Sequence, residues 1–340
     1  MIVILSPQAS ESDLDEILAN LKDRGYGVHV SKGIEKTIVG VIGAHDDDKL
    51  IVAEQLSSLA YVERVVPILK PFKVVSREFH PDKTIIKVGG VDIGGQKIAV
   101  MAGPCSVESE AQTIEVAKAV KAAGASILRG GAFKPSTSPY SFHGLGEDAL
   151  KMLAAAREIT GMPIITEVMD TRDVELVSKY ADILQIGTRN MANYSLLTEV
   201  GNARKPVMLK RGMASTIEEW LQAAEYIANQ GNYEIILCER GIRTFETYTR
   251  NTFDVSAIPT VLGLSHLPII ADPSHGTGRR ALVPGVAKAA VAAGADGLMI
   301  EVHPQPERAL KDGAQSLTPD GFDELLKDCG AVARAVGRYI

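Results

Sequence analysis

Eight short apolar segments, each followed by an amphipathic stretch, alternate from residue 98 to the end of the chain. They lie at residues 98–104, 126–131, 163–168, 182–188, 206–212, 234–241, 268–274 and 297–303. Near-continuous apolar strands that alternate with helices indicate a parallel sheet with helices covering its outer face. Helical periodicity fills the intervals, as at Glu110–Ala123 and Thr216–Gln230. Eight such units predict an α/β protein with a (β/α)8 TIM barrel at residues 98–340.

A doubly wound open sheet is the alternative fold for alternating strands and helices. That fold marks its first strand with a glycine-rich GxGxxG turn, and no such turn follows residues 98–104. The number of strand–helix units is also high for an open sheet. We therefore prefer the barrel.

The first 70 residues carry a separate pattern with the order βαββαβ. Strands are expected at residues 2–5, 27–31, 37–42 and 62–69. A first helix is expected between Ser10 and Gly25, with Leu14, Ile17, Leu18 and Leu21 on one face. A second helix is expected near residues 48–60, with Leu50, Ile51 and Leu56 turned inward. This order predicts a ferredoxin-like domain. Lys70-Pro71 ends it, and residues 71–97 read as a linker with strands that cap the barrel.

Charge and composition exclude several classes of protein. A net charge of −6 argues against a sequence-independent hold on nucleic acid. No apolar run approaches the roughly 20 residues that span a bilayer, and the N-terminus lacks a basic signal region. Three scattered cysteines are too few for a disulfide framework. We expect a cytoplasmic protein that binds neither nucleic acid nor membrane.

Ionisable and polar residues stand at the end of nearly every predicted barrel strand. They are Cys105, Arg129, Glu167, Gln185, Arg189, Lys210, Arg211, Glu239, Arg240, Asp272, His275, Glu301 and His303. The C-terminal ends of the strands of a TIM barrel meet on the face that carries the active site. The pattern therefore predicts an active site at this face.

Four of these positions suit a metal ion: Cys105, His275, Glu301 and, in the loop after the last strand, Asp312. A thiolate, an imidazole and two carboxylates fit a borderline divalent cation such as Zn, Fe, Mn or Co. Taken singly, each residue also has a purely structural explanation as a buried hydrophobe, a cap partner or a turn residue. The first, seventh and eighth strands become neighbours when a barrel closes, and this favours the metal site.

The remaining strand ends are rich in cations. They are Arg129, Lys134, Arg189, Lys210, Arg211 and Arg240, with Arg279 and Arg280 as further candidates. Some are expected to pair with Glu167, Glu239 and Asp272, but the cations outnumber these acids. Arginine and lysine are the common binders of phosphate and carboxylate. The count predicts a substrate with more than one anionic group, one of them a phosphate.

Several long motifs resemble one family. They are AGPCSVES (102–109), LRGGAFKPSTSPYSFHGLG (128–146), QIGTRNM (185–191), MLKRG (208–212), ILCERGIRTFE (236–246), DPSHGTGRR (272–280) and IEVHPQPERALKDGAQS (300–316). These runs resemble the type I-beta branch of the 3-deoxy-D-arabino-heptulosonate 7-phosphate (DAHP) synthases. One subgroup of that branch carries an N-terminal ferredoxin-like regulatory domain, so the resemblance covers essentially the whole chain.

The resemblance implies a reaction. DAHP synthases join phosphoenolpyruvate to erythrose 4-phosphate in a metal-dependent aldol-type condensation that releases phosphate and opens the shikimate pathway to aromatic amino acids. It implies one divalent metal ion (Mn, Fe, Co or Zn), a homotetramer, and feedback inhibition by tyrosine or phenylalanine through residues 1–70. A simple oligomerisation role for residues 1–70 is the alternative.

The resemblance also implies roles for single residues. The metal ligands are Cys105, His275, Glu301 and Asp312; the substrate-binding residues are Arg129, Lys134, Pro135, Ser136, Thr137, Ser138, Glu167, Arg189, Lys210 and Arg240, to which the strand-end pattern adds Arg211. Lys134, Cys105, His275 and Asp312 are the expected catalytic residues. Lys134 and a water on the metal are the candidates for general acid and base.

One departure from the family concerns the loop that holds the aldose phosphate. The expected Lys-Pro-Arg-Thr-Ser reads Lys134-Pro135-Ser136-Thr137-Ser138 here, and His143 stands where a glutamine is expected. Either Arg279 or Arg280 replaces the missing cation, or the acceptor binds weakly, or the acceptor is another aldose such as arabinose 5-phosphate. A catalytically weakened regulatory paralogue is a further alternative.

Overall fold

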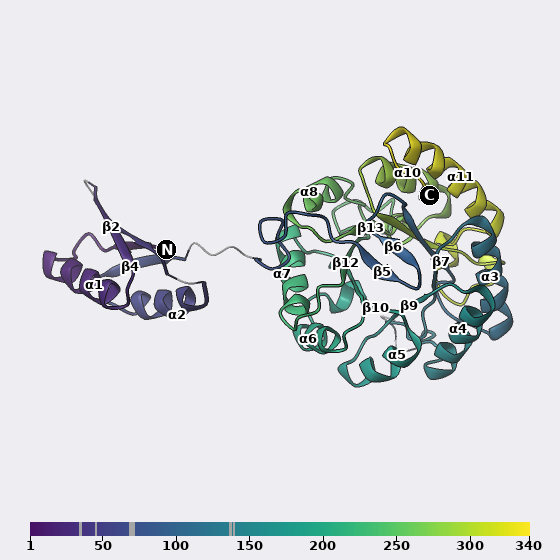
Figure 1. The fold of residues 1–340 in the computed structure, drawn as a ribbon, viewed down its shortest axis with the longest axis horizontal. Coiled ribbons are helices and arrows are strands. Elements are labelled where there is room, and N and C mark those ends of the chain that lie inside the picture. The colour runs from purple at the N-terminus through teal and green to yellow at the C-terminus, as the bar shows by residue number, and fades with distance from the viewer. Residues whose placement is uncertain (34–35, 45, 68–71, 136–137, 139) are drawn as a thin grey trace. The chain divides into compact units, whose positions relative to one another are not determined.

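The computed structural model describes residues 1–33, 36–44, 46–67, 72–135, 138 and 140–340, and among these it does not describe the side chains of residues 46 and 47. Two compact units divide the chain, Met1–Pro71 and Phe72–Ile340. Each unit is described by itself (Figure 1).

The N-terminal unit is a four-stranded antiparallel sheet with two helices. Its elements are β1 (Ile2–Leu5), α1 (Glu11–Asp23), β2 (Gly27–Lys32), β3 (Thr37–Ile42), α2 (Asp46–Ser57) and β4 (Val62–Val66). The strand order β2-β3-β1-β4 follows from the pairing of β1 with both β3 and β4. Ser10 and Asp13 form a capping box that begins α1. The predicted ferredoxin-like fold is confirmed.

The prediction that Leu50, Ile51 and Leu56 turn inward is confirmed for Leu56 and wrong for Leu50 and Ile51. Leu50 and Ile51 are each 59% exposed, whereas Val52, Ala53 and Leu56 of α2 are buried against the sheet. A helix turns about 100° per residue, so the direction midway between residues 50 and 51 lies roughly 200° from the direction midway between residues 52 and 53. The short helix therefore buries the opposite side from the one on which Leu50 and Ile51 lie.

The second unit is a closed barrel of eight parallel strands, as predicted. The strands are β7 (Ala99–Gly103), β8 (Ile127–Arg129), β9 (Ile164–Glu167), β10 (Ile183–Ile186), β11 (Val207–Lys210), β12 (Ile235–Glu239), β13 (Ile269–Ala271) and β14 (Gly297–Glu301). Pairing of β14 with β7 closes the barrel.

Helices surround this barrel (Figure 1). They are α3 (Glu110–Ala123), α4 (Glu147–Thr160), α5 (Val174–Tyr180), α6 (Tyr194–Asn202), α7 (Ile217–Ala228), α8 (Ala257–Leu264), the short α9 (Pro273–Thr277), α10 (Val283–Ala292) and α11 (Pro319–Ala335). Among the described residues, no helix has both the length and the apolar character needed to cross a membrane.

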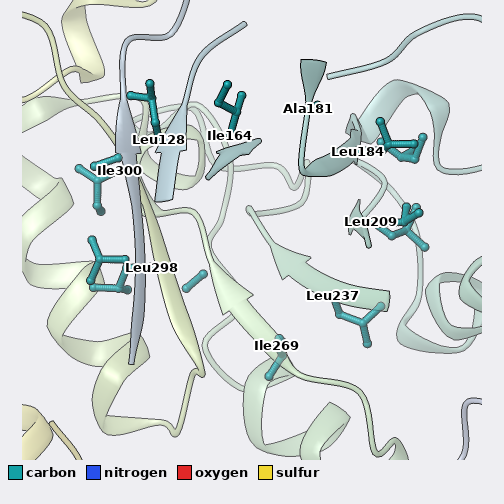
Figure 2. Close-up of a cluster of buried hydrophobic side chains, with 14 of the residues drawn as sticks. Leu128, Ile164, Ala181, Leu184, Leu209, Leu237, Ile269, Leu298 and Ile300 are labelled. Carbon is teal, nitrogen blue, oxygen red and sulfur yellow. The ribbon is translucent and has the colours of Figure 1, made fainter. Parts of the chain in front are cut away.

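Alternate residues of each barrel strand enter two different cores. One set, which includes Leu128, Leu209, Leu237 and Ile300, packs with the surrounding helices (Figure 2). The other set points into the barrel and includes Ile127, Ile165, Ile183, Met208, Cys238, Ile270 and Met299. Because side chains alternate along a strand, this assignment also fixes which way the residue at each strand end points.

A hairpin packs with the interior of the barrel. It consists of β5 (Ile86–Val88) and β6 (Val91–Ile93), and its residues Ile86, Val88 and Ile93 join the core inside the strands. In the view of Figure 1 the hairpin overlaps the middle of the ring of strands. Residues 72–97 belong to the barrel unit, and the finer division at residue 97 stays a prediction.

Candidate active site

The alternation of side chains directs five strand-end residues towards the barrel axis. Arg129, Glu167, Gln185, Lys210 and Arg240 each lie two residues after a side chain of the inner core. All five are buried and line one cavity. The strand pattern, rather than loop geometry, therefore builds the floor of the site.

The cavity has a volume of about 310 Å³ and a strongly cationic wall. It is lined by Arg129, Lys134, Pro135, Ser138, Ser141, Glu167, Gln185, Gly187, Thr188, Arg189, Lys210, Arg240, Arg250, His275, Lys311 and Asp312. Seven of these side chains are lysine or arginine and two are carboxylic acids. Such a wall suits a ligand with several negative charges.

Arg211, predicted to bind substrate, is placed outside this cavity. It follows Lys210, so the alternation turns it towards the helices. Its Nη1 lies 2.9 Å from Glu239 Oε2 and 2.9 Å from Asp254 Oδ2. The guanidinium is therefore committed to a buried ion pair outside the barrel.

The two candidates for replacing the missing loop arginine also lie outside the cavity lining. Arg280 contacts Glu307 Oε1 at 3.3 Å, and the side chain of Arg279 is exposed. Within the loop itself, Pro135 and Ser138 line the cavity. Ser136 and Thr137 lie outside the described residues.

The four predicted metal ligands lie together at one side of the cavity. Ligand atoms of Cys105, Glu301 and Asp312 all lie within 4.8 Å of one another. His275 Nε2 lies 3.5 Å from Glu301 Oε1 and 3.9 Å from Asp312 Oδ2. The segments that carry them follow β7, β13 and β14, which are neighbours as predicted. No other described group of three or more His, Cys, Asp and Glu residues has this spacing.

His275 is oriented by its neighbour Asp272. Its Nδ1 lies 2.7 Å from Asp272 Oδ2, and its backbone N–H donates to Asp272 Oδ1 at 3.0 Å. Burial lowers the pKa of His275, and Asp272 offsets only part of this effect. A neutral imidazole that donates from Nδ1 leaves the lone pair on Nε2, which faces the same centre as the carboxylates of Glu301 and Asp312. A cation at this centre could accept that lone pair.

The two carboxylate oxygens of Glu301 have different surroundings. Its Oε2 accepts a hydrogen bond from Gln315 Nε2 at 2.7 Å. Its Oε1 is fully buried and has no hydrogen-bond partner among the described residues, although Arg129 Nη1 lies 3.2 Å away. An unsatisfied buried carboxylate oxygen next to a thiol and an imidazole fits a divalent cation. The residues present therefore fit the metal that the sequence predicts.

Cys105 and Lys134 meet at the same centre. Lys134 Nζ lies 3.1 Å from Cys105 Sγ and 3.0 Å from Cys105 O. Burial, helped by the charge of Glu301, raises the pKa of the Cys105 thiol to about 12. Burial opposes the charge on Lys134, but Cys105, Glu301 and Glu167 outweigh it and raise the pKa of this amine.

Asp312 reaches the centre from a tight loop. Its backbone has a φ of 53°, a left-handed conformation that aspartate tolerates better than most residues. A Cβ on the next residue, Gly313, would lie 2.0 Å from Pro306 O, so only glycine fits there. Burial opposes ionisation of Asp312, but the guanidinium of Arg250 lowers its pKa to about 2. The loop therefore delivers a permanent carboxylate.

Sequence reasoning missed Arg250, Lys311 and Gln315. Arg250 and Lys311 line the cavity, and Gln315 bonds to Glu301. Arg250 lies in the loop after β12, which also carries Arg243, and no periodicity in that loop distinguishes one arginine from the other. Lys311 and Gln315 flank Asp312 in the quoted motif, so proximity to a predicted ligand was the available signal.

Two family models match the chain. The model described as the DAHP synthetase I family matches residues 79–335, and the model described as the DAHP synthase ferredoxin-like domain matches residues 1–70. A phospho-2-dehydro-3-deoxyheptonate aldolase of Thermotoga maritima is 51% identical over 99% of both chains. A 2-dehydro-3-deoxyphosphooctonate aldolase of Syntrophotalea carbinolica is 35% identical over 73% of this chain and 95% of its own.

Two solved structures from Thermotoga maritima agree with these matches. A crystal structure of the DAHP synthase of Thermotoga maritima superposes with a TM-score of 0.92 at 50% identity, covering 99% of this chain and 98% of its own. A truncated form of the Thermotoga maritima enzyme covers 79% of this chain and 99% of its own, with a TM-score of 0.75 and 50% identity. Both units of the chain therefore have counterparts in a single relative.

Proposed function

The chain belongs to the DAHP synthetase I family, and we propose how its described residues carry out that family's reaction. The reaction condenses phosphoenolpyruvate with erythrose 4-phosphate, releases inorganic phosphate, and is the first step of the shikimate pathway. The observation that carries the assignment of residues is one cavity in which seven cationic side chains adjoin Cys105, His275, Glu301 and Asp312.

We assign phosphoenolpyruvate to the cationic floor of the cavity. Its carboxylate and phosphate would be held by Arg129, Lys134, Arg189, Lys210 and Arg240. Arginine forks bind such groups through two parallel hydrogen bonds, and this fixes the plane of the enol as well as its position. Glu167 lies among these cations and offsets part of their mutual repulsion. Fixed orientation of the enol carbon towards the acceptor lowers the barrier to carbon–carbon bond formation.

We assign the metal to Cys105, His275, Glu301 and Asp312. A divalent ion held there would supply a Lewis acid that polarises the aldehyde of the acceptor. The nature of the donors favours Mn, Fe, Co or Zn over the harder cations Mg and Ca. Asp272 contributes by keeping the His275 imidazole in the orientation that this role requires.

The reaction also needs proton transfers, and Lys134 is placed for one of them. The enol carbon attacks the aldehyde carbon, water adds at C2 of phosphoenolpyruvate, and phosphate leaves by C–O cleavage. The former aldehyde oxygen must gain a proton. Lys134 lines the cavity and its Nζ lies 3.1 Å from Cys105 Sγ, so we assign it the role of general acid.

The acceptor phosphate is assigned to the segment that begins at Lys134 and Pro135. Ser136 replaces an expected arginine there, and neither Arg279 nor Arg280 lines the cavity. Among the relatives, the octulosonate aldolase shares the barrel at 35% identity. Arabinose 5-phosphate is therefore the second acceptor to test.

A phosphate-release assay tests the assignment directly. Full-length protein is incubated with phosphoenolpyruvate and either erythrose 4-phosphate, arabinose 5-phosphate or a non-phosphorylated aldose. We expect fast release with erythrose 4-phosphate, loss of release after chelation, and recovery on addition of Mn, Fe, Co or Zn salts. Release that is unchanged by a chelator, after removal of bound metal is verified by elemental analysis, would contradict the metal assignment. Faster phosphate release with arabinose 5-phosphate than with erythrose 4-phosphate would contradict the assignment of erythrose 4-phosphate as the acceptor.

The N-terminal unit is assigned a regulatory role. We propose that residues 1–70 bind tyrosine or phenylalanine and that binding inhibits the barrel. The match to the ferredoxin-like domain of DAHP synthases supports this role. The similarity to a truncated relative supports the use of a shortened chain as the test. Deletion of residues 1–70 should leave phosphate release intact and abolish inhibition, whereas inhibition that survives the deletion would refute the assignment.

The proposal extends to the oligomeric state of the chain and to its compartment in the cell. We propose a homotetramer in the cytoplasm, where the three cysteines, all free, would stay reduced. Sedimentation equilibrium of the full chain tests the tetramer. A monomer across the micromolar range would rule it out.

A further inference from the structure

We propose that Arg250 and Gln315 form a clamp that positions Glu301 and Asp312 for metal binding. The pair is called the Arg250–Gln315 clamp below. The proposal rests on the metal site of the proposed function. It assigns a positioning role to a cavity-lining arginine and to a buried glutamine 65 residues further along the chain.

The contacts of the clamp join both carboxylates. Arg250 Nη1 lies 3.1 Å from Asp312 Oδ1 and donates to Gln315 Oε1 at 2.8 Å. Gln315 Nε2 in turn donates to Glu301 Oε2 at 2.7 Å. Gln315 is 2% exposed, so its amide has no access to alternative partners in bulk water. One guanidinium nitrogen and one amide thus restrain two acids from separate segments.

The clamp occupies one oxygen of each acid and leaves the other oxygen facing the centre. Glu301 Oε1, opposite the clamped oxygen, lies 3.5 Å from His275 Nε2 and has no hydrogen-bond partner among the described residues. Asp312 Oδ2 lies 3.5 Å from Cys105 Sγ and 3.9 Å from His275 Nε2. These two oxygens, which the clamp does not contact, therefore face the thiol, the imidazole and the guanidinium of Arg129, whose Nη1 lies 3.2 Å from Glu301 Oε1. Bonds that fix the outer oxygen of a ligating carboxylate are the usual way in which proteins orient such ligands.

The backbone of Arg250 is attached to the segment that carries the third ligand. Its N–H donates to Thr277 O at 3.0 Å, and Asn251 Nδ2 donates to His275 O at 2.8 Å. A Cβ on Gly278 would lie 2.4 Å from Arg250 Cβ, so glycine is needed for this close approach. Arg250 is therefore seated on α9 and links the segments of His275, Glu301 and Asp312.

A positioning role and a purely electrostatic role predict opposite changes in metal affinity. A positive guanidinium near a divalent cation repels it, so removal of the charge alone should tighten metal binding. Loss of the clamp should instead weaken binding, because both carboxylates become free to rotate. The sign of the change in Kd separates the two roles without any measurement of activity.

The test is calorimetric titration of Mn²⁺ into the metal-free full-length protein. Arg250→Met and Gln315→Leu remove the clamp, and Arg250→Lys keeps the charge but not the rigid planar guanidinium whose Nη1 contacts both Asp312 and Gln315. Arg172→Met and Gln305→Leu are matched controls, since both residues are exposed and contact surface partners. We expect Kd to rise about 10- to 100-fold in Arg250→Met and Gln315→Leu. The Kd of Arg250→Lys for Mn²⁺ should lie between the values of these two variants and that of the wild type. Both controls should have the wild-type Kd.

A separate measurement checks that each variant is folded before its Mn²⁺ affinity is interpreted. Fluorescence of Trp220, the single tryptophan, reports whether each variant keeps a folded barrel, because this side chain is fully buried in α7. Unchanged or tighter Mn²⁺ binding in folded Arg250→Met, Gln315→Leu or Arg250→Lys would overturn the clamp. Absence of metal binding by the wild type would overturn the proposed metal site as well. Saturating Mn²⁺ should restore most of the phosphate release that the clamp variants lose.

Discussion

His275 Nδ1 lies 2.7 Å from Asp272 Oδ2, the same oxygen that Lys210 Nζ contacts at 2.5 Å. Burial alone would raise the pKa of Asp272, but the adjoining His275 and Lys210 hold it well below its ordinary value. One buried carboxylate thus couples the two halves of the proposed site. It orients a proposed metal ligand and fixes a cation that is assigned to phosphoenolpyruvate.

Asp272→Asn should weaken metal binding. The amide can still accept the backbone N–H of His275 through Oδ1, but it no longer pairs with Lys210 or favours donation from His275 Nδ1. Loss of such a partner of a ligating histidine raises the metal Kd about 10- to 100-fold. The free energy of unfolding should fall by about 3 kcal/mol, because Lys210 is left buried without its acid. Metal titration and urea unfolding measure the two effects.

Glu239→Gln is the matched control for that prediction. Glu239 is as buried as Asp272 and pairs with Arg211, but on the outside of the barrel. Its substitution should reduce stability by a similar amount and leave the metal Kd unchanged. Equal metal affinities in all three proteins would show that Asp272 does not act through His275.

Arg240→Lys should weaken the binding of phosphoenolpyruvate. Arg240 is buried and lines the cavity, and lysine there would replace a forked donor by a single ammonium. Loss of a charged contact is worth about 1.5–3 kcal/mol, so KM for phosphoenolpyruvate should rise about 10- to 100-fold. Arg211→Lys is the paired variant, because Arg211 stands at the end of the neighbouring strand and binds Glu239 and Asp254. Arg211→Lys should leave the KM for phosphoenolpyruvate unchanged. A raised KM in Arg211→Lys together with an unchanged KM in Arg240→Lys would show that Arg211, and not Arg240, binds the substrate.

Gly187→Ala should disturb Glu167. A Cβ at residue 187 would lie 1.9 Å from Glu167 Oε1, so the carboxylate must move away from its place among the cations. We expect kcat/KM to fall about a hundredfold, as displacement of a positioned group by about 1 Å can cause. Gly285→Ala is the control, since a Cβ there contacts nothing within 4 Å in α10 and should add about 0.5–1 kcal/mol of stability. Wild-type kinetics in Gly187→Ala would mean that Glu167 has no role in ordering the site.

Ser136→Arg should lower the apparent KM for erythrose 4-phosphate. Residue 136 lies outside the described residues, so this prediction rests on the sequence motif and on the location of Arg279 and Arg280 beyond the cavity lining. A regained phosphate contact of about 1.5–3 kcal/mol corresponds to a 10- to 100-fold change. Steady-state kinetics with erythrose 4-phosphate as the varied substrate measure it. Unchanged kinetics would show that other groups already hold the acceptor.

Stability of the barrel should decline in mild acid because of His266. Burial lowers the pKa of His266 below its ordinary value of 6.5, and the ring accepts a hydrogen bond from Thr84 at Nδ1 and donates one to Val74 O. The unfolded chain therefore binds more protons than the folded one below pH 6.5. Stability is complete above that pH and falls as the pH drops from there towards the folded-state pKa.

His266→Gln should flatten this dependence, since glutamine keeps a donor and an acceptor but does not titrate. Urea midpoints followed by Trp220 fluorescence at about pH 7.5 and about pH 5.5 compare the variant with the wild type. His29→Gln, an exposed position in the other unit, should retain the wild-type dependence. An equal acid loss in His266→Gln and wild type would assign the effect to other groups.

The location of the site was predictable where it depends on regular structure. Alternating apolar runs indicated eight parallel strands, and the closure of a barrel brings Cys105, His275 and Glu301 to adjoining strand ends. Arg211 was misplaced because each predicted segment extended beyond the observed strand end, so the direction of its last residues was not fixed. Leu50 and Ile51 were misplaced because the rotation of one short helix depends on the sheet that it packs against.

The sequence by itself determined the barrel, the ferredoxin-like domain and the kinds of residue at the mouth, because these follow from periodicity and from chemistry within short segments. Only the tertiary structure decided that Asp272 serves His275 and Lys210 together, and that Arg250 joins Asp312 to Gln315. Lys210 and Asp272 are 62 residues apart in the chain, and Arg250 lies in an aperiodic loop. Such pairings arise from the folding of several loops onto one face, and no local pattern encodes them.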